Sequence, residues 1–490
     1  MNCTGLAGRA RLILNLFLLK LEFTNRYAMK IFSTFLLILS LSTVVYPQSK
    51  IPFVRTKTNS IIMNIEKEKG NFNGVNDIPK TFSYDLGTEH DMSILSLISE
   101  QDSIALLLKY GEKAVFQIIR EAKGDTATCI FTSHKTIKAA TFSHDYKTAN
   151  TGKTIIEAPE VYELINIIFS LTDYGKTGAI NKGTTYYQEV KKHFTPYASL
   201  SAVRTVDSLL KNPDNYYSPL KMDSYAFQFK GDKIEKFGVY DRVSWGSLNE
   251  LEPYLSLLES FAKKSGFREF YKKHKSYYED LENDFRKNID VADMKVWLER
   301  QFPRTKYSAI KVIFSPLVGW NQSANSFSDN GFSEAQAHVD FPFITERQKT
   351  QNPAMTRGQR SKIVFTEINH SYLNPEAEEY VKEIAKAFSD LSVWITKGKP
   401  ASTYNNTLPC FEEYMNYGLV TLYYSDIFDK TISEKLRVDL EENMVSFRGF
   451  QRFKEFDQEV LRLYKTRKSG QTVADLYPEI IDWAGNAGLK

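Results

Sequence analysis

Beyond an apolar run near its start, the sequence lacks a hydrophobic run of membrane length. It also lacks a block of lysine and arginine, an internal repeat and a low-complexity tract. A membrane-spanning helix needs about 20 apolar residues, so the chain is not a polytopic membrane protein. The 63 Lys and Arg against 59 Asp and Glu leave a charge of +4, and residues 1–47 account for that surplus. A remainder with balanced charge argues against a nucleic-acid-binding protein. The composition, 42% hydrophobic and 25% charged, is that of a folded chain with two or three domains.

Cysteine is also scarce. After the first 50 residues only Cys129 and Cys410 remain. Two thiols so far apart in sequence need not meet, so a disulfide and two buried free thiols are both compatible with this pattern. No cysteine follows the N-terminal apolar run, so that point offers no residue for a lipid anchor.

The first 47 residues contain a targeting signal. Met29 and Lys30 precede an apolar run from Ile31 to Val45, and a polar exit follows. This pattern is typical of a secretory signal peptide, with a retained anchor as the alternative. We therefore expect a signal peptide at residues 29–47, an upstream mis-start at residues 1–28, and export to the periplasm or the medium.

The fold class expected from periodicity is α+β, with a mostly helical N-terminal part. Residues 48–150 mix short β-like runs with a predicted helix from Ser93 to Glu121, and their role is unknown. Residues 151–302 are predicted to be helical, with amphipathic segments at 161–169 and 254–278.

The pattern changes after Pro303, where a third region, residues 303–490, is predicted. Strands are expected at 307–314 and 335–343, separated by a loop at Asn321–Gly331. A second loop is expected at Thr345–Arg360, and helical periodicity resumes at Ser361.

Only one of the seven histidines lies in a recognisable motif, Thr366-Glu367-Ile-Asn-His370. In His-Glu-x-x-His on a helix, two imidazoles on one face bind zinc and the glutamate acts as general base. Here Thr366, a poor zinc ligand, replaces the first histidine. On spacing alone, a helix with a partly buried His370 bonded to a neighbour is the favoured interpretation.

The chain resembles the exported bacterial family classed as domain of unknown function 4932, whose gluzincin-like members carry His-Glu-x-x-His followed by an aromatic-Val-Asn-Pro stretch. The corresponding stretch here runs from Thr366 to Tyr372, Asn374 and Pro375, and the similarity covers roughly residues 155–485. The resemblance implies that residues 303–490 form a zincin-like domain with a small mixed sheet and an active-site helix. It also implies Glu367 as catalytic base and His370 as a zinc ligand.

A further zinc ligand is implied on a later helix, in Phe411-Glu412-Glu413-Tyr414-Met415. Glu413 is preferred because it matches the Glu-Tyr-Met stretch of the resembling proteins. Adjacent residues on a helix point about 100° apart, so only one of the two glutamates can face the site. An exposed helix face explains the other.

Thr366 leaves one ligand position vacant. Water could fill it, or His338 on the predicted preceding strand could enter. The alternative for His338 is a polar residue on an exposed strand face.

Three hypotheses on function follow. The chain is an exported zinc-dependent peptidase with weak or lost activity, or a non-catalytic pseudo-peptidase that recognises a peptide or glycan, or an unrelated scaffold. Zinc is the expected cofactor of the first, and a peptide or protein is the expected substrate or ligand. No nucleic-acid partner and no transmembrane span after signal removal are expected.

Overall fold

The computed structural model describes residues 51–57, 60–65, 68–73, 80–88, 92–211 and 217–487. The predicted signal peptide at 29–47 and the upstream segment 1–28 lie outside this range. Within it, no helix combines the length and the apolarity that crossing a bilayer requires.

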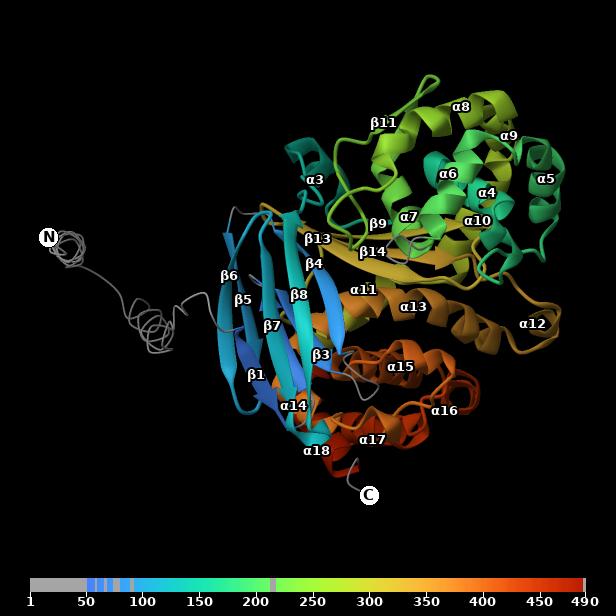
Figure 1. Cartoon of the computed structure of the whole chain (residues 1–490). Helices are drawn as coiled ribbons and strands as arrows, with labels where there is room; N and C mark the ends of the chain where they lie inside the picture. Colours follow the sequence, from blue (N-terminus) through green and yellow to red (C-terminus); the bar gives the residue numbers. More distant parts are fainter. Residues whose placement is uncertain are drawn as a thin grey trace, which may run out of the picture. The chain divides into compact units, whose positions relative to one another are not determined.

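The first part of the described chain is built from strands (Figure 1). Eight strands form two four-stranded sheets, with orders β1-β7-β8-β4 and β3-β2-β5-β6. Their bounds are β1 Phe53–Thr56, β2 Ser60–Ile65, β3 Glu68–Asn73, β4 Thr81–Thr88, β5 Met92–Ile98, β6 Ser103–Lys109, β7 Lys113–Arg120 and β8 Asp125–Lys135. Residues of both sheets share one core, which contains Val54, Leu95, Phe116 and Phe131.

The expected helix at Ser93–Glu121 is therefore wrong, because this stretch forms β5, β6 and β7. Leu95 and Leu97 are buried, whereas Ile94 is 57% exposed and Leu107 is 59% exposed. Burial alternates with a period of two, as in a strand. Apolar residues on both faces of these strands produce a sequence spacing that resembles helical periodicity. Residues 53–135 are thus mainly a β structure.

The central sheet has the order β13-β14-β12-β9. Its strands are β9 Thr154–Glu157, β12 Ala309–Ser315, β13 Ser323–Asp329 and β14 Phe332–Asp340. β9, β12 and β14 are parallel to one another, and the edge strand β13 is antiparallel to β14. Because β9 pairs with β12, the sheet joins the regions predicted at 151–302 and 303–490. The small mixed sheet expected from the sequence is present.

The strands predicted at 307–314 and 335–343 are confirmed as β12 and β14, but the loop predicted at Asn321–Gly331 is largely β13. The turn needs only Asn330 and Gly331, whose φ angles of 47° and 77° suit a two-residue hairpin. The serines and asparagine of β13 lie on an edge strand, where polar side chains are tolerated.

Helices follow the strands and cover the sheet (Figure 1). Those before β12 are α3 His144–Asn150, α4 Glu160–Leu171, α5 Thr185–Phe194, α6 Ser201–Leu210, α7 Tyr217–Asp223, α8 Leu255–Ser265, α9 Phe267–Lys273, α10 Lys275–Asn288 and α11 Val291–Gln301. Those after β14 are α12 Glu346–Thr350, α13 Pro353–Glu378, α14 Val381–Ala387, α15 Thr407–Ile427, α16 Lys430–Glu442, α17 Phe453–Thr466 and α18 Tyr477–Ala487. A short hairpin, β10 Phe227–Lys230 and β11 Lys233–Lys236, lies before α8.

The loop predicted at Thr345–Arg360 is mostly helical. Thr345 and Gln348 form a capping box at the start of α12, and Asn352 caps α13 with Pro353 as its first residue. The polar residues that favoured a loop are the exposed faces of these helices.

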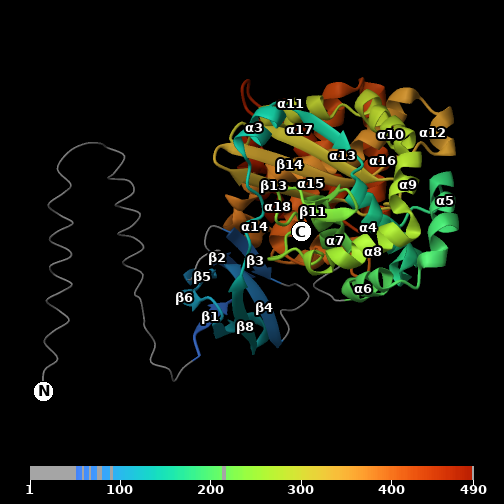
Figure 2. The same ribbon diagram turned by 90° about the horizontal axis from the view of Figure 1, so that it is seen from above.

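Helix α13 packs against β13 and β14, and the sheet separates it from α4 and α7 (Figure 1). In both views the first eight strands lie beside α14 (Figure 2), and α14 contacts β2. Cys129 and Cys410 are buried free thiols in two separate cores.

Candidate functional site

Helix α13 carries the motif residues along one partly exposed stripe. Gln359, Ile363, Glu367, His370 and Asn374 follow one another at spacings of three or four residues, which place them on the same face. All five are partly exposed, while most of their neighbours on the helix are buried. We call this row the α13 stripe.

His370 is held at both ring nitrogens. Nδ1 lies 3.1 Å from Asn374 Oδ1, and Nε2 lies 2.8 Å from Asn416 Nδ2. With the imidazole proton on Nδ1, the ring donates a hydrogen bond to Asn374 Oδ1, and Nε2 accepts a hydrogen bond from the Asn416 amide. The lone pair of Nε2 therefore points toward α15, where Glu413 Oε2 lies 3.7 Å away.

Glu413 is a buried carboxylate with a full set of partners. Its Oε1 accepts from Arg448 Nη2 at 2.7 Å and from the Tyr404 hydroxyl at 3.0 Å. Its Oε2 accepts from Asn416 Nδ2 at 3.3 Å. Arg448 is itself packed over the rings of Tyr404 and Tyr417. The charge of Glu413 is thus already compensated by a guanidinium.

The structure places Glu413, and not Glu412, beside His370. The pKa of the Glu412 carboxyl is raised well above its ordinary value by burial and by the negative charges of Glu378 and Glu413. The two glutamates diverge as adjacent positions on α15 must.

Glu367 lies among charged groups of three elements. Burial raises the pKa of its carboxyl to about 7, with His370 and Lys221 favouring the ionised form and Glu413 and Asp340 opposing it. Lys221, on α7, donates to the Asn321 carbonyl at 2.7 Å, and burial lowers its pKa to about 7. A carboxyl that titrates near neutral pH is suited to proton transfer or to hydrogen bonding in either state.

Thr366 does not replace the missing histidine. Its hydroxyl donates to the Ile363 carbonyl of the same helix at 3.1 Å, and the residue is 5% exposed. The side chain is occupied by the helix backbone and offers no donor atom beside His370.

His338 is not on an exposed strand face, as the sequence favoured, but is completely buried. Its Nε2 lies 3.1 Å from Gln336 Oε1, and its ring lies near those of Tyr162 and Tyr225. Burial, with Lys221 and Lys311, holds the pKa of His338 well below its ordinary value. The residue faces the α4 side of the sheet and is not brought to His370.

The donor atoms near His370 give two protein ligands for a metal, His370 Nε2 and Glu413 Oε2. Across the described ranges, no group of three or more His, Cys, Asp or Glu is arranged to hold a metal ion. A catalytic zinc site takes three protein ligands and a water. With Thr366 turned away and Glu413 paired to Arg448, the residues do not fit a catalytic zinc ion.

Sequence reasoning found Glu367, His370 and Glu413 but missed Asn416 and Arg448. Asn416 follows Glu413 by three residues on α15, and this spacing is a signal that the same face continues. Arg448 lies in a π-helical turn, Asn443–Arg448, and no local pattern connects it to Glu413.

Comparison with known proteins gives one match. The profile of a family described as Domain of unknown function (DUF4932) matches residues 155–483, more than half of the chain. No curated protein and no solved structure matches.

Proposed function

The chain belongs to the family described as Domain of unknown function (DUF4932), and on that premise we propose that it is an exported, zincin-like pseudo-peptidase that holds a peptide without cleaving it. The observation that carries the proposal is the Glu413–Arg448 ion pair. It places a fixed cation on the carboxylate that a zincin offers to zinc.

The arrangement of the elements supports the zincin-like part of the proposal. A helix with Glu367 and His370 lies next to a mixed sheet with an antiparallel edge strand, and α15 brings Glu413 to His370. A small mixed sheet beside the motif helix and a glutamate from a later helix are what the family resemblance implies.

The length of the α13 stripe supports a peptide as the ligand. From Gln359 to Asn374 it extends about 22 Å at the helical rise of 1.5 Å per residue. An extended chain of about six or seven residues has this length. One apolar side chain, Ile363, lies among the polar side chains of the stripe, so the stripe suits a peptide with side chains of mixed character.

The edge of β13 is partly closed to strand pairing. The Trp245 indole donates to the Ala324 carbonyl at 3.0 Å, and the Ser326 amide donates to Asn325 Oδ1 at 2.9 Å. Since an added strand needs such edge groups, the bound peptide relies on the α13 stripe more than on β13.

A weak zinc peptidase is the second candidate. The distance of 3.7 Å between His370 Nε2 and Glu413 Oε2 is favourable for sharing one ion, and Glu367 titrates near 7. For this candidate Arg448 would have to release Glu413.

The two candidates differ in what they do to an unstructured polypeptide. Fluorescein-labelled β-casein is mixed with the purified mature chain in zinc-containing buffer, and anisotropy and electrophoresis are followed together. We expect binding without cleavage, lost in Ile363→Arg on the α13 stripe and kept in Val438→Arg on the exposed face of α16. Cleavage that Glu367→Gln abolishes would establish the peptidase instead. If the wild type neither binds nor cleaves β-casein, both candidates are rejected.

Zinc content gives a second measurement. We expect less than one tightly bound zinc per chain by elemental mass spectrometry after dialysis. Thr366→His together with Arg448→Met should raise zinc affinity more than either substitution alone, because one adds a ligand and the other frees Glu413. One zinc per wild-type chain would favour the peptidase.

Export rests on the sequence at residues 29–47. Peptide mapping of the protein from its native cell envelope or medium should find a new N-terminus soon after Pro47. A full-length cytosolic chain with Met29–Pro47 intact would contradict export.

A further inference from the structure

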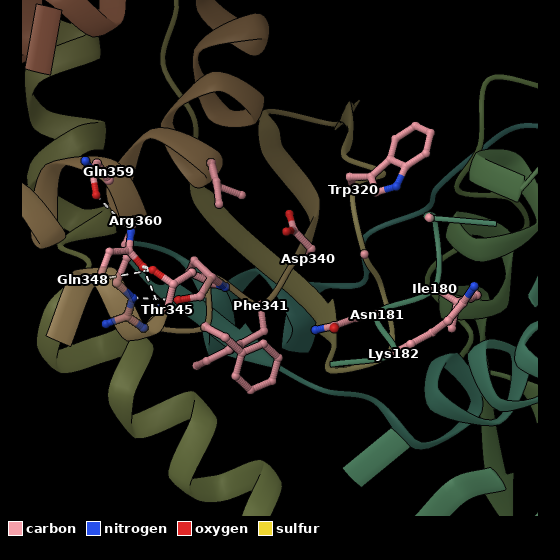
Figure 3. A pocket seen from close by; sticks show the side chains of 15 residues that line it. Ile180, Asn181, Lys182, Trp320, Asp340, Phe341, Thr345, Gln348, Gln359 and Arg360 are labelled. Atoms are coloured by element: carbon pink, nitrogen blue, oxygen red, sulfur yellow. Dashed lines mark hydrogen bonds between the residues drawn. The ribbon is translucent and has the colours of Figure 1, made fainter. Parts of the chain in front are cut away.

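A cavity of about 560 Å³ lies at the end of β14, between the loop that contains Gly178 and Lys182, the turn at Trp320 and the first half of α13 (Figure 3). Cavities of 300–1,000 Å³ are typical of small-molecule sites. Ile363 belongs both to this cavity and to the α13 stripe, so the two adjoin. The cavity contains no residue of the motif.

Trp320 forms one wall and is 68% exposed. Its indole rests on Gly178, where an added Cβ would lie 2.1 Å from the indole Nε1. The absence of a side chain at position 178 therefore leaves the space that the indole edge occupies.

The turn that carries Trp320 is fixed by backbone contacts. Gly319 donates to the Ala179 carbonyl at 2.8 Å, and Asn181 donates to the Leu317 carbonyl at 2.7 Å. A Cβ on Gly319 would lie 2.2 Å from the Gly178 carbonyl oxygen, so the two loops approach as closely as glycine allows. An exposed indole is thus held on a rigid support, as a stacking surface requires.

Polar groups line the same cavity (Figure 3). One oxygen of Asp340 accepts from Gln322. Asn181 accepts from the Gly183 amide at 3.0 Å through its oxygen, which leaves its NH2 group to donate. Gln359 accepts from Gln348 and Gln351 through its oxygen and likewise keeps its NH2 group.

The charges of the cavity disfavour an ionic ligand. Arg360 is neutralised by Asp284 and also donates to the Pro342 carbonyl. An anion would meet Asp340, and a cation would meet Lys182 on the wall. A purely apolar group would leave the NH2 groups of Asn181 and Gln359 without an acceptor, which is costly once water is displaced.

A neutral ring with an apolar C–H face and a rim of hydroxyls satisfies all of these surfaces. We propose that this cavity is a saccharide-binding site, in which one sugar ring stacks on Trp320 and its hydroxyls bond to Asp340, Asn181 and Gln359. This site adjoins the α13 stripe through Gln359 and Ile363, and the saccharide proposed for it does not depend on the proposed function.

The test uses the whole mature chain and a panel of neutral oligosaccharides of glucose, galactose, mannose, xylose and N-acetylglucosamine, titrated by calorimetry. We expect at least one member to bind, and Trp320→Ala to weaken that binding at least tenfold. Trp245→Ala is the matched control, since Trp245 is also exposed, at 51%, but lies outside the cavity. This control should bind as the wild type does.

Gly178→Ala provides a second variant that keeps Trp320 but displaces its indole, and it should weaken the same saccharide. Binding of none of the panel, or binding that Trp320→Ala leaves unchanged, would overturn the proposal. If Trp320→Ala weakens β-casein binding and no saccharide binds, the cavity is part of the peptide-binding surface on the α13 stripe, and the proposal is also overturned.

Discussion

At the scale of single residues, the ion pair of Arg448 and Glu413 sets the charge beside His370. Both side chains are largely buried, with 16% and 4% exposed. A buried carboxylate without its counter-charge is strongly unfavourable, so the pair fixes both the charge and the position of Glu413. Any cation other than Arg448 must compete with this bond.

Arg448→Met should lower the free energy of unfolding by about 3–5 kcal/mol, because it leaves the Glu413 carboxylate buried and unpaired. The double variant Arg448→Met with Glu413→Gln should recover most of the loss, since no charge then remains. Urea denaturation followed by circular dichroism measures both. Arg462→Met, which breaks an exposed pair with Glu459, is the control and should change little. Equal effects of the two arginine substitutions would show that the buried pair does not stabilise the fold.

Glu367 should make stability depend on pH. Burial raises its pKa from an ordinary 4.5 to about 7, so between these values the folded chain holds a proton that the unfolded chain has lost. Stability from this group is therefore complete below about pH 4.5 and is lost as pH rises through 7.

Glu367→Gln, which stays neutral, should stabilise the chain more at pH 8 than at pH 5, by at most about 3 kcal/mol. Urea midpoints of wild type and variant at the two pH values measure the difference. Glu383→Gln, on the exposed surface of α14, controls for the loss of one carboxylate. An equal gain at both pH values would mean that folding does not raise the pKa of Glu367.

At the scale of elements, helix α13 continues through Pro375, and a residue just before β12 supplies the hydrogen bond that the proline cannot make. Pro375 has no N–H to donate to the carbonyl four residues before it, that of Ser371. The Tyr307 hydroxyl donates to this carbonyl instead, at 2.9 Å. The bond ties the end of the motif helix to the start of β12.

Tyr307→Phe should cost about 1–3 kcal/mol, because the buried Ser371 carbonyl loses its donor. With Pro375→Ala in the background, the alanine amide can donate to Ser371, and the cost of Tyr307→Phe should shrink. The four proteins of this double-mutant cycle, unfolded in urea, give the coupling energy directly. A coupling near zero would mean that Tyr307 does not substitute for the missing amide.

The elements also show what the sequence can and cannot predict. β12, β14, the α13 motif and the choice of Glu413 over Glu412 followed from apolar runs, turn residues and a resembling motif. The helix predicted at Ser93–Glu121 failed because Ile94 and Leu107 are exposed apolar residues on strands, which sequence periodicity counts as core. Arg448 could not be predicted, because its contact with Glu413 depends on how α15 and the Asn443–Arg448 turn pack.

At the scale of the whole molecule, the first eight strands form a unit with its own core, and the family match begins after it, at residue 155. The segment between them belongs to the central sheet. Lys138 pairs with Asp329 at 2.8 Å, and the Tyr146 hydroxyl donates to Glu334 at 2.6 Å. Glu334 is completely buried, and Tyr146 shares it with Tyr240, Gln336 and Lys311.

A chain of residues 136–490 should therefore fold without the eight strands, whereas residues 155–490 should not fold stably. The longer chain keeps Lys138, Tyr146 and β9. It loses the packing of Ile62 and Ile98 against the main core, the contacts of β2 with α14 and of β3 with α15, and the hydrogen bond between His134 and Ser247. The shorter chain leaves the Glu334 carboxylate without Tyr146 and exposes the face of Phe332 that Phe142 covers.

Circular dichroism melts and limited proteolysis of both chains measure this difference, with residues 53–490 as reference. We expect one cooperative transition for 136–490 within a few degrees of the reference, and a broad or absent transition for 155–490. Failure of 136–490 to fold would mean that the strands and the sheet form one cooperative unit, and equal stability of the two truncated chains would mean that α3 contributes nothing to the sheet.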